Sequence, residues 1–69
     1  MEKIKSLVSC KNRKALITGA SGHLGREVSK ALASIGYELI IVDLDLQKLK
    51  KLSIEISSSY KVNVSPISC

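Results

Sequence analysis

The sequence contains no tryptophan and no phenylalanine, and it has only two tyrosines among its 69 residues. Stacking on nucleic-acid bases needs exposed aromatic rings, so this composition argues against a nucleic-acid-binding surface. The formal net charge of +5 does not change that, because most basic residues fall in two groups, a solvated N-terminal segment and one helix face. We therefore expect no nucleic-acid partner. The two groups are Lys3, Lys5, Lys11, Arg13 and Lys14, and then Lys48, Lys50 and Lys51.

Long apolar runs and clustered metal ligands are also absent. No apolar run approaches the ~18 residues of a membrane span, and the lipoprotein-like box ending at Cys10 lacks the apolar stretch that precedes a cleavage site, because Lys3 and Lys5 interrupt it. Cys10 and Cys69 lie near the two ends of the chain, and no His/Cys pair has metal-ligand spacing. We expect a cytoplasmic protein with reduced thiols, no metal site and no membrane contact.

What the sequence does contain is leucine, isoleucine, valine and alanine in short continuous runs. The segments from Lys14 to Thr18 and from Glu38 to Val42 each contain an unbroken apolar run, which is typical of strands buried in a parallel sheet. A third strand is expected from Val62 to Ile67, and Pro66 inside it indicates the edge of a sheet. Residues 1–13 show no sustained period and are expected to form a leader or short irregular segment, with Ile4, Leu7 and Val8 on one amphipathic turn.

Two helices are expected between these strands. The first runs from about Gly22 to Ile35 and ends at Gly36, and the second begins at Asp45 as N-cap and ends in the serine run 57–59. Each carries one apolar face at helical spacing. These faces are Leu24, Val28, Ala31, Leu32 and Ile35 on the first helix, and Leu46, Leu49, Leu52 and Ile56 on the second.

The order β-α-β-α-β predicts an α/β protein, the first half of a doubly wound parallel-sheet Rossmann fold. Right-handed crossovers that run in one direction place both helices on the same face of the sheet. The other face then has nothing to cover it, and each large apolar side chain left in water forfeits roughly 1.5–3 kcal/mol. We expect residues 14–69 to be an incomplete part of a domain, a fragment completed by the remainder of a longer protein or by a partner chain.

A glycine-rich segment from Thr18 to Gly25 joins the first of these strands to the first helix. Gly19 permits a tight turn, Gly22 lets phosphates approach the backbone, and Gly25 allows close packing of helix on strand. A helix start offers free N–H groups and the positive end of a dipole to an anion. The segment therefore predicts a pyrophosphate site formed by Thr18, Gly19, Ser21, Gly22, His23, Leu24 and Gly25.

An acid follows the second strand. Asp43 lies 18 residues beyond Gly25, near the ~20 expected for a carboxylate that binds the adenosine ribose of a dinucleotide. Such a carboxylate accepts hydrogen bonds from the ribose hydroxyls and repels a 2′-phosphate, so NAD is expected in preference to NADP. Simpler alternatives stay open: the glycines serve only a tight turn, Asp45 replaces Asp43 as ligand, His23 is a solvent-facing residue, and Arg26 contacts a phosphate.

The segments from Lys14 to Gly25 and from Leu39 to Asp43 resemble the N-terminal part of the short-chain dehydrogenase/reductase family. The resemblance implies an NAD(P)-dependent oxidoreductase that transfers hydride to or from a carbonyl or alcohol. The spacing of Gly22 and Gly25 is commoner in the family's extended group, so an epimerase or dehydratase of nucleotide sugars is one alternative, and a non-catalytic dinucleotide-binding protein or inactive fragment is another. The family's catalytic Tyr-x-x-x-Lys is absent, because Tyr37 and Tyr60 are followed by Ile41 and Val64. We expect no catalytic residue in this chain and no turnover by it alone.

Overall fold

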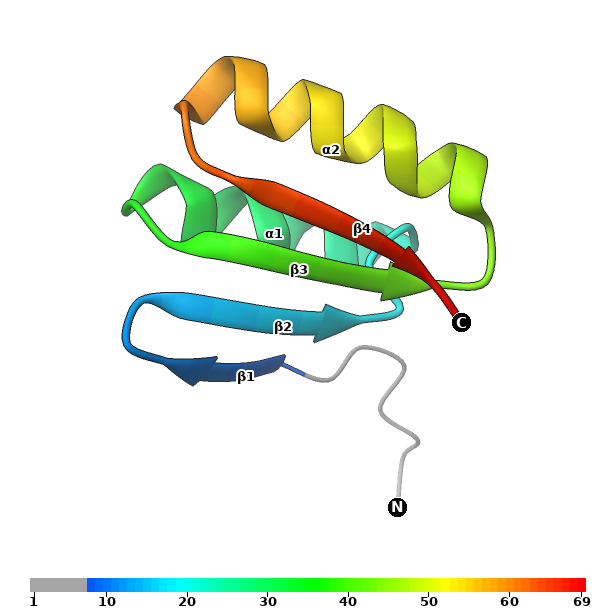
Figure 1. The fold of residues 1–69 in the computed structure, drawn as a ribbon, viewed down its shortest axis with the longest axis horizontal. Helices are drawn as coiled ribbons and strands as arrows, with labels where there is room; N and C mark the ends of the chain where they lie inside the picture. The colour runs from blue at the N-terminus through cyan, green and yellow to red at the C-terminus, as the bar shows by residue number, and fades with distance from the viewer. Residues whose placement is uncertain (1–7) are drawn as a thin grey trace.

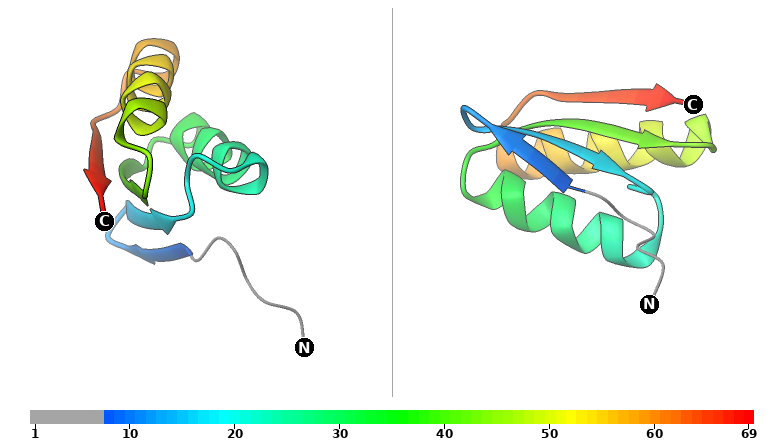
Figure 2. Two further views of the ribbon diagram at one scale, coloured as in Figure 1. Left: turned by 90° about the vertical axis from the view of Figure 1, so that its right-hand side faces the viewer. Right: turned by 90° about the horizontal axis from the view of Figure 1, so that it is seen from below.

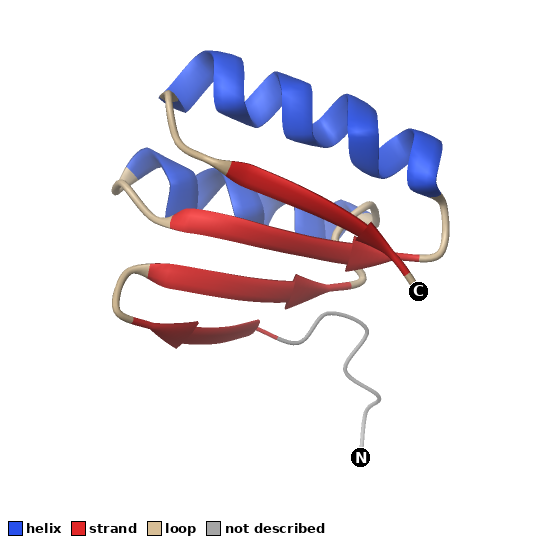
Figure 3. Cartoon of the chain, in the orientation of Figure 1, coloured by secondary structure: helices blue, strands red, loops and turns tan. Residues whose placement is uncertain are grey.

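The computed structural model describes residues 8–69 of the chain. Four strands form one sheet in the order β1-β2-β3-β4, and two helices pack on it (Figure 1; Figure 3). The strands β2, β3 and β4 are parallel to one another, whereas β1 pairs antiparallel with β2. In chain order the elements are β1 (Val8–Lys11), β2 (Lys14–Thr18), α1 (His23–Ser34), β3 (Glu38–Asp43), α2 (Leu46–Tyr60) and β4 (Val64–Ser68).

The two predicted central strands and their shared helical layer are confirmed. In the parallel register Ala15 lies opposite Leu39 and Ile17 opposite Ile41, and all four side chains are at most 1% exposed. Figure 2 shows why, because both helices cover the same face of the sheet. These side chains and the inner sides of the helices form the core, as right-handed crossovers running in one direction require.

The opposite face of the sheet is uncovered, as the sequence predicts. Leu16 of β2 and Ile67 of β4 point to that face and are 40% and 48% exposed. Ile40 and Val42 of β3 lie between them and are only partly buried. The chain thus presents an apolar sheet face to solvent, the expected state of a Rossmann half without its second helical layer.

Helix α2 packs with the predicted face. Leu49, Leu52 and Ile56 are buried, while Leu46 at the first turn is 39% exposed. The carboxylate of Asp45 accepts a hydrogen bond from the Lys48 amide at 3.1 Å, which confirms Asp45 as N-cap. The helix continues through the serine run to Tyr60 and ends at Lys61 in the left-handed conformation, so the serines do not end it.

The predicted apolar face of α1 is wrong. The buried residues of the helix are Gly25, Ser29 and Ala33, whereas Leu24 and Ile35 are 58% and 63% exposed. The residues against the sheet are small because α1 approaches β2 and β3 closely at Gly25, and the Ser29 hydroxyl is satisfied by the Gly25 carbonyl at 2.7 Å. Of the predicted face, Leu32 packs against the border of the core and Val28 is partly buried.

The irregular structure expected before residue 14 is wrong for residues 8–11, which form β1. Asn12 and Arg13 both have positive φ, +53° and +63°, and this two-residue turn folds β1 back on β2. A hairpin of four residue pairs is too short for an alternating pattern of apolar and polar residues to be recognised in the sequence. Ile4 and Leu7 of the expected amphipathic turn lie outside the described residues, and the division at residue 13 stays a prediction.

The remaining sequence expectations concern the edge strand, the end of α1, the cysteines and the membrane. β4 is an edge strand with Pro66 inside it, as predicted, and Gly36 after α1 has a φ of +91°, the left-handed conformation expected of a residue that ends a helix. Cys10 and Cys69 are exposed and free. No helix in residues 8–69 is long and apolar enough to span a membrane, and the cytoplasmic location stays a prediction.

Candidate functional site

The turn between β2 and α1 is tied to the end of β3. Gly19 takes a φ of +65°, a conformation that glycine adopts without steric cost, and its carbonyl accepts a hydrogen bond from the Gly22 amide at 3.1 Å. Ala20 is fully buried, and its amide donates to the Val42 carbonyl at 3.1 Å. These contacts hold the start of α1 beside the carboxyl ends of the parallel strands, where ligands bind in open α/β sheets.

Gly25 is required by close packing. A Cβ on this residue would overlap the Gly19 carbonyl oxygen and would lie 2.7 Å from the Ala20 Cα, so the backbone itself blocks any side chain. A Cβ on Gly22 would meet only the Gly19 oxygen, at 3.4 Å, an ordinary contact. The structure therefore assigns Gly25 to helix packing, whereas at position 22 a side chain would meet the backbone only at this ordinary contact distance.

The start of α1 is not capped by a side chain. Gly22 is the N-cap and supplies no side-chain hydrogen bond, and the first amides of any helix have no acceptor within the helix. His23 and Leu24 are exposed, and the first turn contains no acidic residue. Donors and dipole are thus available to an anion at this point, and the carboxyl-terminal edge of the sheet borders it.

Asp43, at the end of β3, is directed at this turn. Its Oδ2 accepts hydrogen bonds from the Ser21 amide at 3.0 Å and from the Ser21 hydroxyl at 2.5 Å, and its Oδ1 accepts one from the Leu44 amide at 2.7 Å. The predicted phosphate loop and the predicted ribose acid therefore meet in the structure. Asp45 instead caps α2, and its carboxylate makes no hydrogen bond to the β2–α1 turn in the described residues.

Asp43 stays ionised at neutral pH. The hydrogen bond from the Ser21 hydroxyl lowers the pKa of Asp43 most, the Leu44 amide lowers it further, and partial desolvation acts in the opposite direction. The Ser21 amide and the positive charge of Lys48 also lower this pKa. Oδ2 already accepts two hydrogen bonds and Oδ1 accepts one, so of the roughly four lone-pair sites of a carboxylate one remains, on Oδ1, for a further hydroxyl group.

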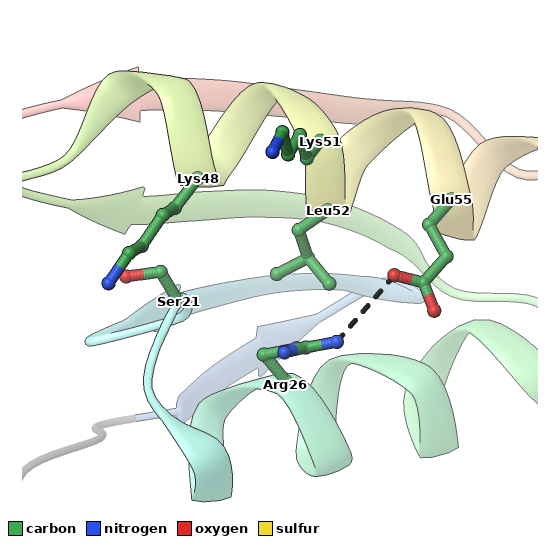
Figure 4. Close-up of a pocket in the computed structure, with 6 residues that line it drawn as sticks. All are labelled: Ser21, Arg26, Lys48, Lys51, Leu52 and Glu55. Atoms are coloured by element: carbon green, nitrogen blue, oxygen red, sulfur yellow. Dashed lines mark ion pairs between the residues drawn. The ribbon is translucent and has the colours of Figure 1, made fainter.

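A basic pocket of about 290 Å³ opens beside Ser21, between α1 and α2 (Figure 4). Lys48 extends toward Ser21, and its charge acts on Asp43. Glu55 is held by Lys30 at 3.0 Å and by Arg26 at 3.8 Å, so its charge is compensated on the α1 side. The residues that line the pocket are Ser21, Arg26, Lys48, Lys51, Leu52 and Glu55.

Lys48 and Lys51 line this pocket, which the sequence does not reveal. Charge patterning places them on a solvated helix face, yet their spacing from each other and from Glu55 is that of one helical face. That spacing brings them together on the side of α2 that faces α1. Arg26 lines the same pocket from α1, next to the predicted phosphate loop. Within residues 8–69, no group of His, Cys, Asp or Glu side chains has the arrangement of a metal site.

Several curated relatives of the chain share one name. The chain is 49% identical over 51 residues to the very-long-chain 3-oxoacyl-CoA reductase of Phaeosphaeria nodorum, covering 74% of this chain and 15% of that protein. It is 36% identical over 64 residues to the same-named protein of Scheffersomyces stipitis, covering 93% of this chain and 18% of the relative. The chain thus spans less than a fifth of the length of these relatives. No family model matches it.

Solved structures share the fold at the same partial coverage. An alcohol dehydrogenase of Comamonas testosteroni, specific for bulky-bulky ketones, superposes with a TM-score of 0.76 and 30% identity over 78% of this chain and 22% of that one. A short-chain dehydrogenase of Sphingobium yanoikuyae in complex with NADPH gives a TM-score of 0.77 and 30% identity, covering 78% of this chain and 21% of its own. The matching part is less than a quarter of each enzyme.

Proposed function

This chain belongs to the short-chain dehydrogenase/reductase family, and from that premise we propose that it forms the adenosine-binding part of an NAD(P)-dependent oxidoreductase. One observation carries the proposal: Asp43 and Ser21, from two different crossover units, are hydrogen-bonded at the uncapped start of α1. The names of the relatives support a reductase or dehydrogenase. They give no support to an epimerase, a dehydratase or a non-catalytic binding protein.

The residues present fit a dinucleotide. The first-turn amides of α1, with Ser21 and the backbone of Gly22, would hold the pyrophosphate, as we expect of Thr18, Gly19, His23, Leu24 and Gly25 together. The Asp43 carboxylate would accept hydrogen bonds from the adenosine ribose. A bound nicotinamide dinucleotide supplies or accepts a hydride, and this chain contributes the grip on its adenosine half.

Both NAD and NADP are proposed as cofactors. Asp43 favours free ribose hydroxyls, which supports NAD, as the sequence predicts. Its charge, however, is already shared among three protein donors, and the pocket beside it contains Lys48 and Lys51. Cations at that place offset the repulsion between the carboxylate and a 2′-phosphate, so NADP would not be rejected.

Catalysis requires residues beyond this chain. Tyr37 precedes β3 and Tyr60 ends α2. Both tyrosines therefore lie near the amino ends of the parallel strands, whereas Asp43 lies at the carboxyl end of β3. Neither has a lysine four residues later. We therefore propose that the tyrosine and lysine of the family's reaction come from the part of the protein outside this sequence.

The experiment uses 5′-ADP, the part of both cofactors that this half of the fold would bind. Titration of the 69-residue chain followed by NMR is expected to shift the amides of the β2–α1 turn. Asp43→Asn should weaken 5′-ADP binding by roughly tenfold, since hydrogen bonds to a charged group contribute about 1.5–3 kcal/mol. Asp45→Asn is the matched control, because asparagine also caps helices. Equal affinities of the two variants would refute the ribose role of Asp43.

A further inference from the structure

β1 occupies the outer edge of β2 (Figure 1). In a doubly wound sheet the strands follow the order 3-2-1-4-5-6, and β4, β3 and β2 take the places of strands 3, 2 and 1. In that order the next place, along the outer edge of β2, belongs to a fourth strand that runs parallel to β2. β1 lies in that place and runs in the opposite direction.

The hold of β1 on the sheet is weak. All its residues are exposed, and among the described elements it contacts β2 alone. Its turn requires positive φ at both central residues, a conformation that Asn12 accepts easily and that Arg13 adopts at a cost. β1 therefore has little besides its ladder of backbone hydrogen bonds to keep it in place.

The strand that β1 pairs with has the composition of a strand with parallel neighbours on both edges. β2 has the apolar run Ala15, Leu16 and Ile17 at its centre, and such a run is typical of strands that are paired on both edges inside a parallel sheet. The solved structures that match this chain are far longer than the chain itself, which covers only 22% of the Comamonas testosteroni enzyme. One edge carries a single set of N–H and C=O groups, so two strands cannot pair with it at the same time.

We propose that β1 is a displaceable strand that protects the outer edge of β2 until an apolar parallel strand from the rest of a family-length domain takes its place. Uncovered edges pair with other chains, and a short strand with exposed lysine reduces that hazard while it is docked. The partner of this edge is an extended segment of the same domain. The proposal concerns assembly of the sheet and does not depend on cofactor binding.

Amide hydrogen exchange on the 69-residue chain tests the release of β1. Amides of β1 are expected to exchange at least ten times faster than those of β3, because local release needs no global unfolding. Arg13→Gly removes the strain of the turn and should slow exchange in β1 roughly fivefold, with no change in β3. If β1 and β3 exchange at one common rate, β1 opens only with the whole fold and the proposal is overturned.

A second variant opens the edge. Ser9 lies opposite Leu16, two pairs from the turn, where alternation makes the pair hydrogen-bonded, so Ser9→Pro removes a ladder bond. We expect this variant to associate in sedimentation experiments while β3 stays protected. Ser9→Thr, which keeps the N–H group, is the control and should remain like the original chain. A Ser9→Pro chain that keeps the sedimentation of the control contradicts an edge-protecting role.

Whether another strand displaces β1 from the edge of β2 is tested by lengthening the chain. The chain is fused at Cys69 to the part of the Sphingobium yanoikuyae enzyme that follows its matching segment. In the folded fusion, nuclear Overhauser contacts between Ser9 and Leu16 should disappear and β1 should lose its exchange protection. Persistence of the β1–β2 contacts in a folded fusion would overturn the proposal, and this outcome is independent of whether 5′-ADP binds.

Discussion

Ser21 and Asp43 are joined by two hydrogen bonds to a single carboxylate oxygen, although 22 residues separate them in sequence. One residue belongs to the turn before α1 and the other ends β3. The pair therefore couples the predicted phosphate loop to the predicted ribose acid, and the shape of the site depends on the ionisation of one carboxyl group.

The coupling predicts a loss of order in acid. The hydrogen bonds from Ser21 hold the pKa of Asp43 below its ordinary value of 3.8, so this carboxylate contributes stability above that value and the contribution is lost as pH falls through the lower, folded pKa. Ser21→Ala should raise the pKa of Asp43 toward 3.8, as measured by NMR titration of the side-chain carboxyl carbon. Ser53→Ala, which removes an exposed hydroxyl on α2, should leave it unchanged. An unchanged Asp43 titration in Ser21→Ala would contradict the assignment.

Gly25→Ala is expected to be severely destabilising. The added methyl group would overlap the backbone of Gly19 and Ala20, which cannot move without opening the β2–α1 turn. Overpacking of this kind costs roughly 3 kcal/mol or more, a large part of the stability of a small domain. Gly22→Ala is the control and should cost less than about 1 kcal/mol, because its methyl group makes an ordinary contact. Urea unfolding measures both, and equal costs would show that Gly25 is not the packing residue.

The basic pocket predicts a specific response to a 2′-phosphate. The chain should bind 2′,5′-ADP at least as tightly as 5′-AMP, which lacks only the 2′-phosphate, although Asp43 lies beside the site. Lys48→Gln and Lys51→Gln should each weaken 2′,5′-ADP binding roughly three- to tenfold, as expected for the loss of a charge-assisted contact, and leave 5′-AMP within about twofold. Lys50 lies on the same helix but does not line the pocket, so Lys50→Gln controls for net charge. A uniform effect of all three substitutions on both nucleotides would refute the pocket's role.

Local patterns in the sequence predict the parallel strands, the cap at Asp45 and the meeting of the glycine loop with Asp43. These features depend on neighbouring residues and on the rule that parallel strands end at one edge. The buried face of α1 could not be found in this way. Apolar periodicity points to Leu24 and Ile35, but the close approach at Gly25 turns small residues toward the sheet. Leu24 and Ile35 themselves stay 58% and 63% exposed.

The sequence predicted the glycine-rich turn and Asp43 as parts of the candidate site. It did not predict Lys48 and Lys51. Glycines followed by an acid at this spacing indicate one kind of ligand, a dinucleotide, whereas lysines on a helix are usually solvated. Only the three-dimensional arrangement shows that Lys48 and Lys51 line one pocket with Ser21 and Arg26 and that Lys48 extends toward Ser21 (Figure 4). β1 escapes prediction because its pairing depends on a turn in which Arg13 adopts an unfavourable conformation.

The uncovered sheet face gives the last prediction. Leu16 and Ile67 are 40% and 48% exposed on it, whereas Ile17, next to Leu16 in β2, is fully buried on the other face. Leu16→Gln and Ile67→Gln should change the free energy of unfolding by less than about 1 kcal/mol, and together they should reduce self-association in sedimentation experiments, because exposed apolar patches drive association. Ile17→Gln should instead cost more than roughly 3 kcal/mol, since it buries an unsatisfied amide and loses packed volume. If Leu16→Gln were as costly as Ile17→Gln, the face would already be covered, and the chain would not need the rest of a domain on that side.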